Sequence, residues 1–187
     1  MNRRILIITV LVALVVLASN WLSNQREQKQ ATAVTAAAHV PDYFLRDFTA
    51  TTMNPQGKPE QRLTAQLMEH YSNDNSMDLT APQLTLFQPS GPPWLVVAAR
   101  GRIIDGGKEV LLSGGVRMDH DAQGTTMTLT TDHLLLRPKQ RYAETDAAVT
   151  VTTPQGRVDA VGMQADMATQ RLQLLSKVRG TYAPQTH

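Results

Sequence analysis

The hydrophobic residues of this chain follow two different patterns, which change near residue 41. Residues 5–18 are apolar except for Thr9. From residue 43 onward, apolar and polar residues alternate with a period of two, as in strands that bury one face. The pattern therefore predicts one N-terminal helix followed by an all-β domain.

Turn signals divide the second region into successive strands. They are short segments rich in Gly, Asn, Asp and Pro at residues 54–57, 72–75, 105–108, 121–124, 138–141 and 154–156. Pro82 predicts an edge strand or a bulge, because proline has no backbone N–H to donate. The one helical alternative in this region is a short segment at residues 163–168.

The N-terminal segment predicts a membrane anchor. Residues 5–22 make an 18-residue span, which as a helix rising about 1.5 Å per residue covers a hydrocarbon core of about 30 Å. Trp21 suits the interface, and Arg3 and Arg4 favour a cytoplasmic N-terminus. A cleaved signal peptide is the alternative, because Val16-Leu17-Ala18 resembles a cleavage site. Both interpretations place the following domain across the membrane.

These patterns divide the chain into four parts. We expect a cytoplasmic N-terminus at residues 1–4, a transmembrane helix at 5–22, a linker at 23–41 and a β domain at 42–187. The linker is polar and then rich in alanine, which suits either a flexible tether or an extension of the helix.

Composition removes several classes of function. Lys and Arg number 18 against 16 Asp and Glu, and no basic cluster lies beyond Arg3–Arg4, so we expect no nucleic acid partner. The absence of cysteine excludes disulfides, thiolate metal sites and lipid attachment through a cysteine. The five histidines lack the spacing of a metal site, and no serine lies in a G-x-S-x-G motif. The sequence thus predicts no catalytic residues, no metal and no cofactor.

The alternation defines an inward set of residues that is almost entirely aliphatic. Its members are Phe48, Ala50, Leu63, Leu67, Leu79, Leu84, Leu86, Leu112, Val116, Met118, Met127, Leu129, Leu134, Leu136, Val149, Val151, Val158, Ala160, Leu172 and Leu174. One interpretation is an ordinary β-sandwich core. The other is an open trough that accepts acyl chains, since Leu, Val and Met adapt to alkyl shapes. Composition does not separate the two.

The order of several short motifs resembles the LptC family of the lipopolysaccharide export machinery. They are "NPQG" (54–57), "RLTAQLMEHYS" (62–72), "LTAPQLTLF" (79–87), Pro93-Trp94, "TTDHLLL" (130–136) and "LLSKVRGTY" (174–182). Together with the anchor they cover nearly the whole chain. One departure is Val151, where the resemblance leads us to expect a glycine.

This resemblance implies an open, twisted β-jellyroll of two antiparallel sheets with a lipid groove between them. It implies a non-enzymatic inner-membrane protein that receives lipopolysaccharide from the LptB-LptF-LptG ABC transporter and passes it to periplasmic LptA. The alternatives are a cleaved, soluble LptA-like bridge, another lipid carrier of this fold, or a periplasmic hydrolase with an unrecognised site.

Candidate site residues follow from the alternation and from this resemblance. The expected groove comprises Phe48, Ala50, Leu79, Leu112, Val116, Met127, Leu129, Val149, Val158 and Ala160. The last predicted strand would offer an unpaired edge to LptA. The expected edge residues are Leu172, Leu174, Lys177, Arg179 and Tyr182.

Overall fold

The computed structural model describes residues 40–89, 91–122 and 124–182. Residues from Pro41 onward form one compact unit. The predicted anchor at 5–22 and almost all of the linker lie outside the described residues. Within the described ranges, no helix is long and apolar enough to cross a membrane.

The described residues form eleven strands and two single turns of 3-10 helix. They are β1 (Tyr43–Met53), β2 (Pro59–Tyr71), β3 (Ser76–Thr80), β4 (Gln83–Leu86), β5 (Trp94–Val97), β6 (Arg100–Ile104), η1 (Asp105–Gly107), β7 (Glu109–Ala122), β8 (Thr125–Arg137), η2 (Pro138–Gln140), β9 (Tyr142–Thr153), β10 (Gly156–Asp166) and β11 (Arg171–Tyr182). The predicted all-β class is confirmed. The predicted turns at 54–57, 72–75, 105–108 and 138–141 lie between these strands, and of the predicted turn at 154–156 only Gly156 belongs to a strand, as the first residue of β10.

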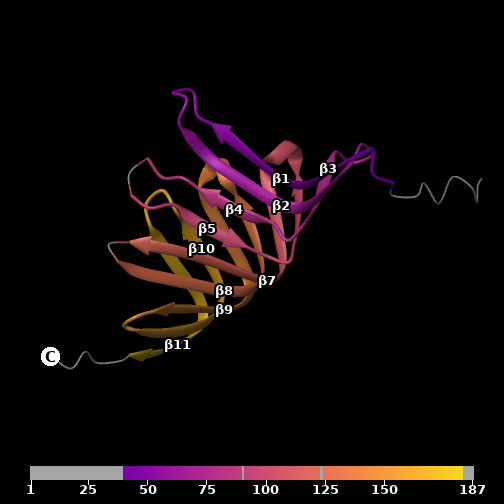
Figure 1. The fold of residues 1–187 in the computed structure, drawn as a ribbon. Helices are drawn as coiled ribbons and strands as arrows, with labels where there is room; N and C mark the ends of the chain where they lie inside the picture. Colours follow the sequence, from indigo (N-terminus) through magenta and orange to yellow (C-terminus); the bar gives the residue numbers. More distant parts are fainter. Residues whose placement is uncertain (1–39, 90, 123, 183–187) are drawn as a thin grey trace, which may run out of the picture. The chain divides into compact units, whose positions relative to one another are not determined.

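All eleven strands belong to one antiparallel sheet, which replaces the two separate sheets that we expected. Its order is β11-β10-β9-β8-β7-β5-β4-β2-β3-β6, with β1 paired to β2 and β6 also paired to β7. β3 and β4 lie end to end along β2, and β6 and β5 lie end to end along β7. Figure 1 shows β1 at one edge of this sheet and β11 at the other.

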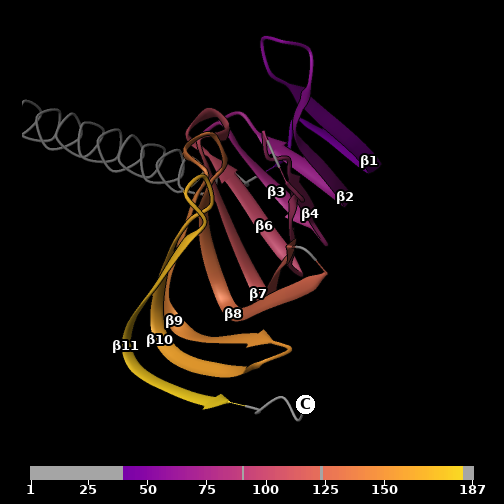
Figure 2. The same ribbon diagram turned by 90° about the vertical axis from the view of Figure 1, so that its left-hand side faces the viewer.

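The sheet bends along a line that crosses the strands near their middles. We call this the fold line; it is marked by Asp47, Ala81, Ala99, Gly114–Gly115, His133, Asp146, Gly162 and Lys177. Several of these residues have positive φ, and the pairing register shifts beside the glycines of β7 and β10. Such bulges bend a strand because an extra residue opposes one on its partner. Figure 2 shows the resulting curvature of β9, β10 and β11.

Neighbouring bends are joined by polar contacts. The Ala81 N–H donates to the Ala99 carbonyl at 2.8 Å. Further along the fold line, Nε2 of the His133 ring lies 2.6 Å from Oδ1 of the Asp146 carboxylate. The Ser176 hydroxyl donates to the Val161 carbonyl at 2.9 Å. The first and the last of these bonds satisfy backbone groups at the interruption of the ladder, and the contact between His133 and Asp146 links the side chains of two neighbouring bends.

The core fills the concave side of the bent sheet. It is one large cluster with Met118, Leu136 and Met163 at its centre, and a smaller one around Leu79. Both halves of the sheet contribute, so the two halves face each other across the core. This arrangement explains how a single sheet gives a two-layered domain.

Three sequence-based expectations need correction at the fold line. Leu67 does not belong to the buried set, because β2 changes phase there and buries Ala65 and Met68 instead. The helical alternative at 163–168 is wrong: β10 runs to Asp166 and a turn follows at 167–170. Of the two alternatives for Pro82, the edge strand is wrong: Pro82 is buried in the middle of the sheet, in the interruption between β3 and β4.

Candidate functional site: an apolar inner face with two free edges

The concave side of the sheet, which we call the inner face, carries continuous rows of apolar side chains. The strand registers place nine residues opposite one another in one such row: Ala50, Leu63, Leu84, Val96, Met118, Leu129, Val151, Val158 and Gly180. Residues directly opposite on adjacent strands have neighbouring side chains on the same face. The row therefore forms an apolar path from β1 to β11.

All ten predicted groove residues lie on this inner face. Leu79, Leu112, Val116, Leu129, Val149 and Ala160 are at most 5% exposed, so the two halves of the sheet cover them. Phe48, Met127 and Val158 are half-buried, and Ala50 is exposed. The positions that an external molecule meets first are therefore those of β1 and of the C-terminal strands.

A cavity of about 130 Å³ lies between the two halves of the sheet near β1. Ala50, Leu63 and Leu84 line it from one half. Leu79 and Leu112 line it from the other, together with residues of η1 and η2. Gly101 keeps space beside it, because a Cβ atom there would lie 3.2 Å from both Leu112 and Pro82. The cavity is small.

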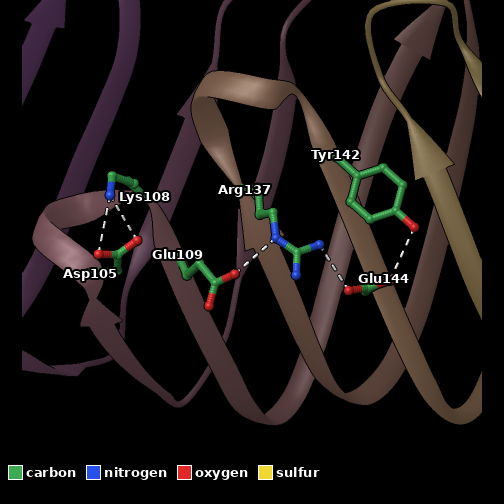
Figure 3. A network of polar contacts seen from close by, with 6 residues as sticks. All are labelled: Asp105, Lys108, Glu109, Arg137, Tyr142 and Glu144. Carbon is green, nitrogen blue, oxygen red and sulfur yellow. Dashed lines mark hydrogen bonds and ion pairs between the residues drawn. The ribbon is translucent and has the colours of Figure 1, made fainter.

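Polar contacts hold the two turns that border this cavity (Figure 3). Lys108, which follows η1 directly, pairs with Asp105 of η1 at 3.0 Å. At the end of β8, Arg137 bridges Glu109 of β7 and Glu144 of β9, each at 2.9 Å. The hydrogen bonds that Arg137 donates to Glu109 and Glu144 raise the pKa of its guanidinium. Burial, and then the bond to Glu144, raises the pKa of Tyr142. Arg137 thereby links β7, β8 and β9 next to η2.

A second cavity, of about 350 Å³, lies at the C-terminal end of the inner face. It is lined by Val151, Val158, Gly180 and Tyr182, among others. Here the structure brings together a predicted groove residue, Val158, and a predicted edge residue, Tyr182. The apolar row is therefore bordered by a cavity beside β11 as well as by the cavity near β1.

Both lateral edges of the sheet are free of partners within the described part of the chain. β1 pairs only with β2, and β11 pairs only with β10. Leu172 and Leu174 of β11 are half-buried on the inner face, whereas Lys177, Arg179 and Tyr182 are exposed. A long strand with unpaired N–H and C=O groups is a template for pairing with another strand.

The histidines of the described residues do not converge on a common site. His70 contacts Asp42 and Asn75, His133 contacts Asp146, and His120 stacks on Trp94 with ring centroids 4.1 Å apart. Among the residues that the structure describes, no three metal-binding side chains gather together.

Sequence reasoning missed two features of the inner face. Trp94 and His120 are both nine-tenths buried, and their ring nitrogens have no partner among the described residues. It also missed a polar pocket at the start of β2 and just after the end of β4. The alternation around Trp94 gave a usable signal for its burial, whereas the pocket joins segments far apart in sequence.

With this geometry in view, comparison with known proteins identifies the family. The family model for lipopolysaccharide assembly, LptC-related, matches residues 8–183. The chain belongs to the LptC family. The resemblance inferred from the ordered motifs is therefore confirmed.

Relatives and a solved structure agree with this membership. The lipopolysaccharide export system protein LptC of Escherichia coli K12 is 24% identical over 182 residues, covering 96% of this chain and 93% of that protein. The LptC of Shigella flexneri matches to the same extent. The fold is also similar to the crystal structure of LptH from Pseudomonas aeruginosa, the LptA homologous periplasmic component of its lipopolysaccharide transport device. That match has a TM-score of 0.54 at 9% identity and covers 66% of this chain and 95% of LptH, so it concerns the fold alone.

Proposed function

We propose that this LptC-family protein is a non-enzymatic lipopolysaccharide-binding component of the export machinery. The main support is the unbroken apolar inner face that runs from β1 to β11 and has a cavity near each end. Acyl chains gain by leaving water for such a face, while the charged sugar-phosphate head stays solvated. Transport along a face needs no catalytic group, because energy from ATP is supplied by a partner.

The path that we propose enters at one free edge and leaves at the other. Lipopolysaccharide comes from the LptB-LptF-LptG transporter on the β1 side and passes to LptA at β11. Leu172, Leu174, Lys177, Arg179 and Tyr182 form the receiving edge for LptA. Pairing of strand edges would join the inner faces of two proteins into one apolar path. The two positive side chains add attraction for an acidic partner.

Crosslinking from neighbouring positions of β1 tests lipid contact. We expect a photoreactive residue at Phe48 or Ala50 to capture lipopolysaccharide in cells, because both positions lie on the inner face. The same residue at Thr49 or Thr51 should capture none, since alternate residues of a strand face away. These four adjacent positions are matched controls for one another. Equal capture at all four would rule out the inner face as the lipid site.

We further propose that residues 5–22 anchor the protein in the inner membrane, with residues 1–4 cytoplasmic and the β domain periplasmic. The alternative is a cleaved, soluble bridge similar to LptA, and the fold likeness to LptH fits both. Intact-mass measurement of the protein from native membranes separates them. We expect a chain that retains the residues before position 19, because the apolar span is long enough to stay in the bilayer. A mature chain starting at Ser19 would establish the soluble alternative.

A further inference from the structure

A polar pocket lies next to the apolar cavity of β1. It has a volume of about 240 Å³ and is lined by parts of the β1–β2 turn, by residues 87–89 after β4 and by Arg141 after η2. Thr52 and Gln61 line the apolar cavity, and the chain continues from them into this turn. Likewise, Pro138 of η2 lines the apolar cavity and Arg141 lines the polar pocket. The two spaces are therefore adjacent at one end of the inner face.

Two cations of this pocket lack an internal counter-ion. Neither Lys58 nor Arg141 forms an ion pair with any residue in the described ranges, in contrast to Arg137, which has two carboxylate partners. Glu60 also lines the pocket. The two cations and this one carboxylate give the pocket a formal net charge of +1. Arg62 adds a further positive group nearby, with its guanidinium 5.6 Å from the centre of the Phe87 ring.

The Arg141 side chain is held in place rather than free. Its Nη1 donates a hydrogen bond of 2.9 Å to Oε1 of Gln88, which joins segments 53 residues apart. The backbone of Arg141 has a left-handed conformation, φ 52°, and its carbonyl accepts the Met167 N–H at 2.8 Å. The other side-chain atom of Gln88, Nε2, is a buried donor with no partner among the described residues. A fixed guanidinium and an unused amide donor suit an oxygen-rich anion.

We infer that this pocket binds a phosphate group, carried by an amphiphile whose acyl chain occupies the adjacent apolar cavity. Lys58 and Arg141 supply the charge, and Gln88 supplies a further hydrogen-bond donor. Arginine is suited to phosphate because its planar guanidinium offers several donors in a fixed arrangement. The inference rests on the proposed function, since it assigns the phosphates of lipopolysaccharide to one place on this protein.

The test uses the full chain in micelles of dodecyl maltoside, a detergent without phosphate, with a photoreactive residue at position 50 to report lipid capture. Lipopolysaccharide is titrated in parallel with the same lipid after enzymatic removal of its phosphates. We expect the dephosphorylated lipid to need about tenfold higher concentration for half-maximal capture, as loss of charge-assisted hydrogen bonds predicts. Inorganic phosphate is added as a competitor. Competition would show that the phosphate group alone is recognised, and its absence would show that the group must be attached to the lipid.

Variants then place the effect in the pocket. Lys58→Gln and Arg141→Gln should each weaken capture of the phosphorylated lipid several-fold and leave the dephosphorylated lipid unchanged. Glu60→Gln should strengthen capture, because it removes the opposing charge. Lys139→Gln is the matched control, since Lys139 lies two residues from Arg141 and does not line the pocket. Lys58 is exposed, so its variant stays informative even if Arg141→Gln alters folding.

The outcomes separate the two proposals. Equal capture of both lipids by the unchanged protein, or no effect of either cation variant, overturns the phosphate site while the inner face still binds acyl chains. Failure of Ala50 to capture either lipid instead overturns the proposed function.

Discussion

At the residue scale, His70 links the start of β1 to the turn between β2 and β3. Its Nδ1 lies 2.7 Å from Asp42 and its Nε2 lies 3.1 Å from Asn75, while Tyr43 stacks on the ring at 4.5 Å. With acceptors at both nitrogens, the imidazolium form is favoured. The hydrogen bond to Asp42, and then that to Asn75, raises the pKa of His70, and the bond to His70 lowers the pKa of Asp42.

The Asp42→Asn variant tests this contact through its pH dependence. A raised histidine pKa gives stability that is complete below the ordinary value of 6.5 and is lost as pH rises through the folded-state value. A lowered Asp42 pKa gives stability that is present above 3.8 and is lost as pH falls through the folded-state value. We therefore expect the unfolding temperature of Asp42→Asn to fall furthest below that of the unchanged chain at about pH 5, and the difference to shrink at about pH 9. A difference that is constant with pH would contradict the charged pair.

At the element scale, β11 combines a half-buried inner side with an exposed edge. It pairs with β10 from Arg171 to Tyr182, with a register shift near Lys177. Removing the strand would expose Val158 and leave β10 as a new edge, so a point substitution is the cleaner test of partner binding. Neighbouring residues of an edge strand direct their N–H groups to opposite sides, one toward β10 and one outward.

Proline at Arg179 and at Gly180, in separate variants, tests the edge. Only one of these two residues directs its N–H toward β10. Proline at that residue should remove the hydrogen bond to β10 and lower the unfolding temperature. The other variant should keep its unfolding temperature and bind LptA at least about tenfold more weakly, because it removes an outward donor and the edge is where pairing occurs. Affinity for LptA and thermal unfolding are measured on both. If each folded variant bound LptA as the unchanged chain does, the handover edge would lie elsewhere.

At the scale of the whole domain, the fold line decides how one sheet encloses a core. Gly162 is a key point on this line, with φ 78°; a Cβ atom there would lie 2.9 Å from Cδ1 of Leu175 and 3.2 Å from its Cβ. Gly57 has a similar φ of 73° but nothing within 4 Å of its would-be Cβ. The two glycines thus share the backbone strain that alanine would suffer and differ in crowding.

Alanine substitution at these two glycines tests whether the bend is tightly specified. We expect Gly57→Ala to lower the free energy of unfolding by about 1 kcal/mol, the usual cost of a left-handed backbone without glycine. Gly162→Ala should lower it by about 2–3 kcal/mol, since the strain is joined by a clash with β11. Denaturant unfolding of the full chain gives both values. Equal losses would mean that β10 and β11 move apart easily at the fold line.

The sequence by itself determined the strands, most turns and the side of each strand that is buried. Alternation placed Ala50, Leu129 and Val158 on one face, because a period of two is a local property of extended backbone. It failed at Leu67, where β2 changes phase at the fold line, and in the segment 163–168, where strand pairing on both sides overrides a weak helical pattern. Only the tertiary structure decided that the strands form one bent sheet, that six groove residues are covered, and that Lys58, Gln88 and Arg141 meet. Those outcomes depend on pairing and on contacts between distant segments, which no local pattern encodes.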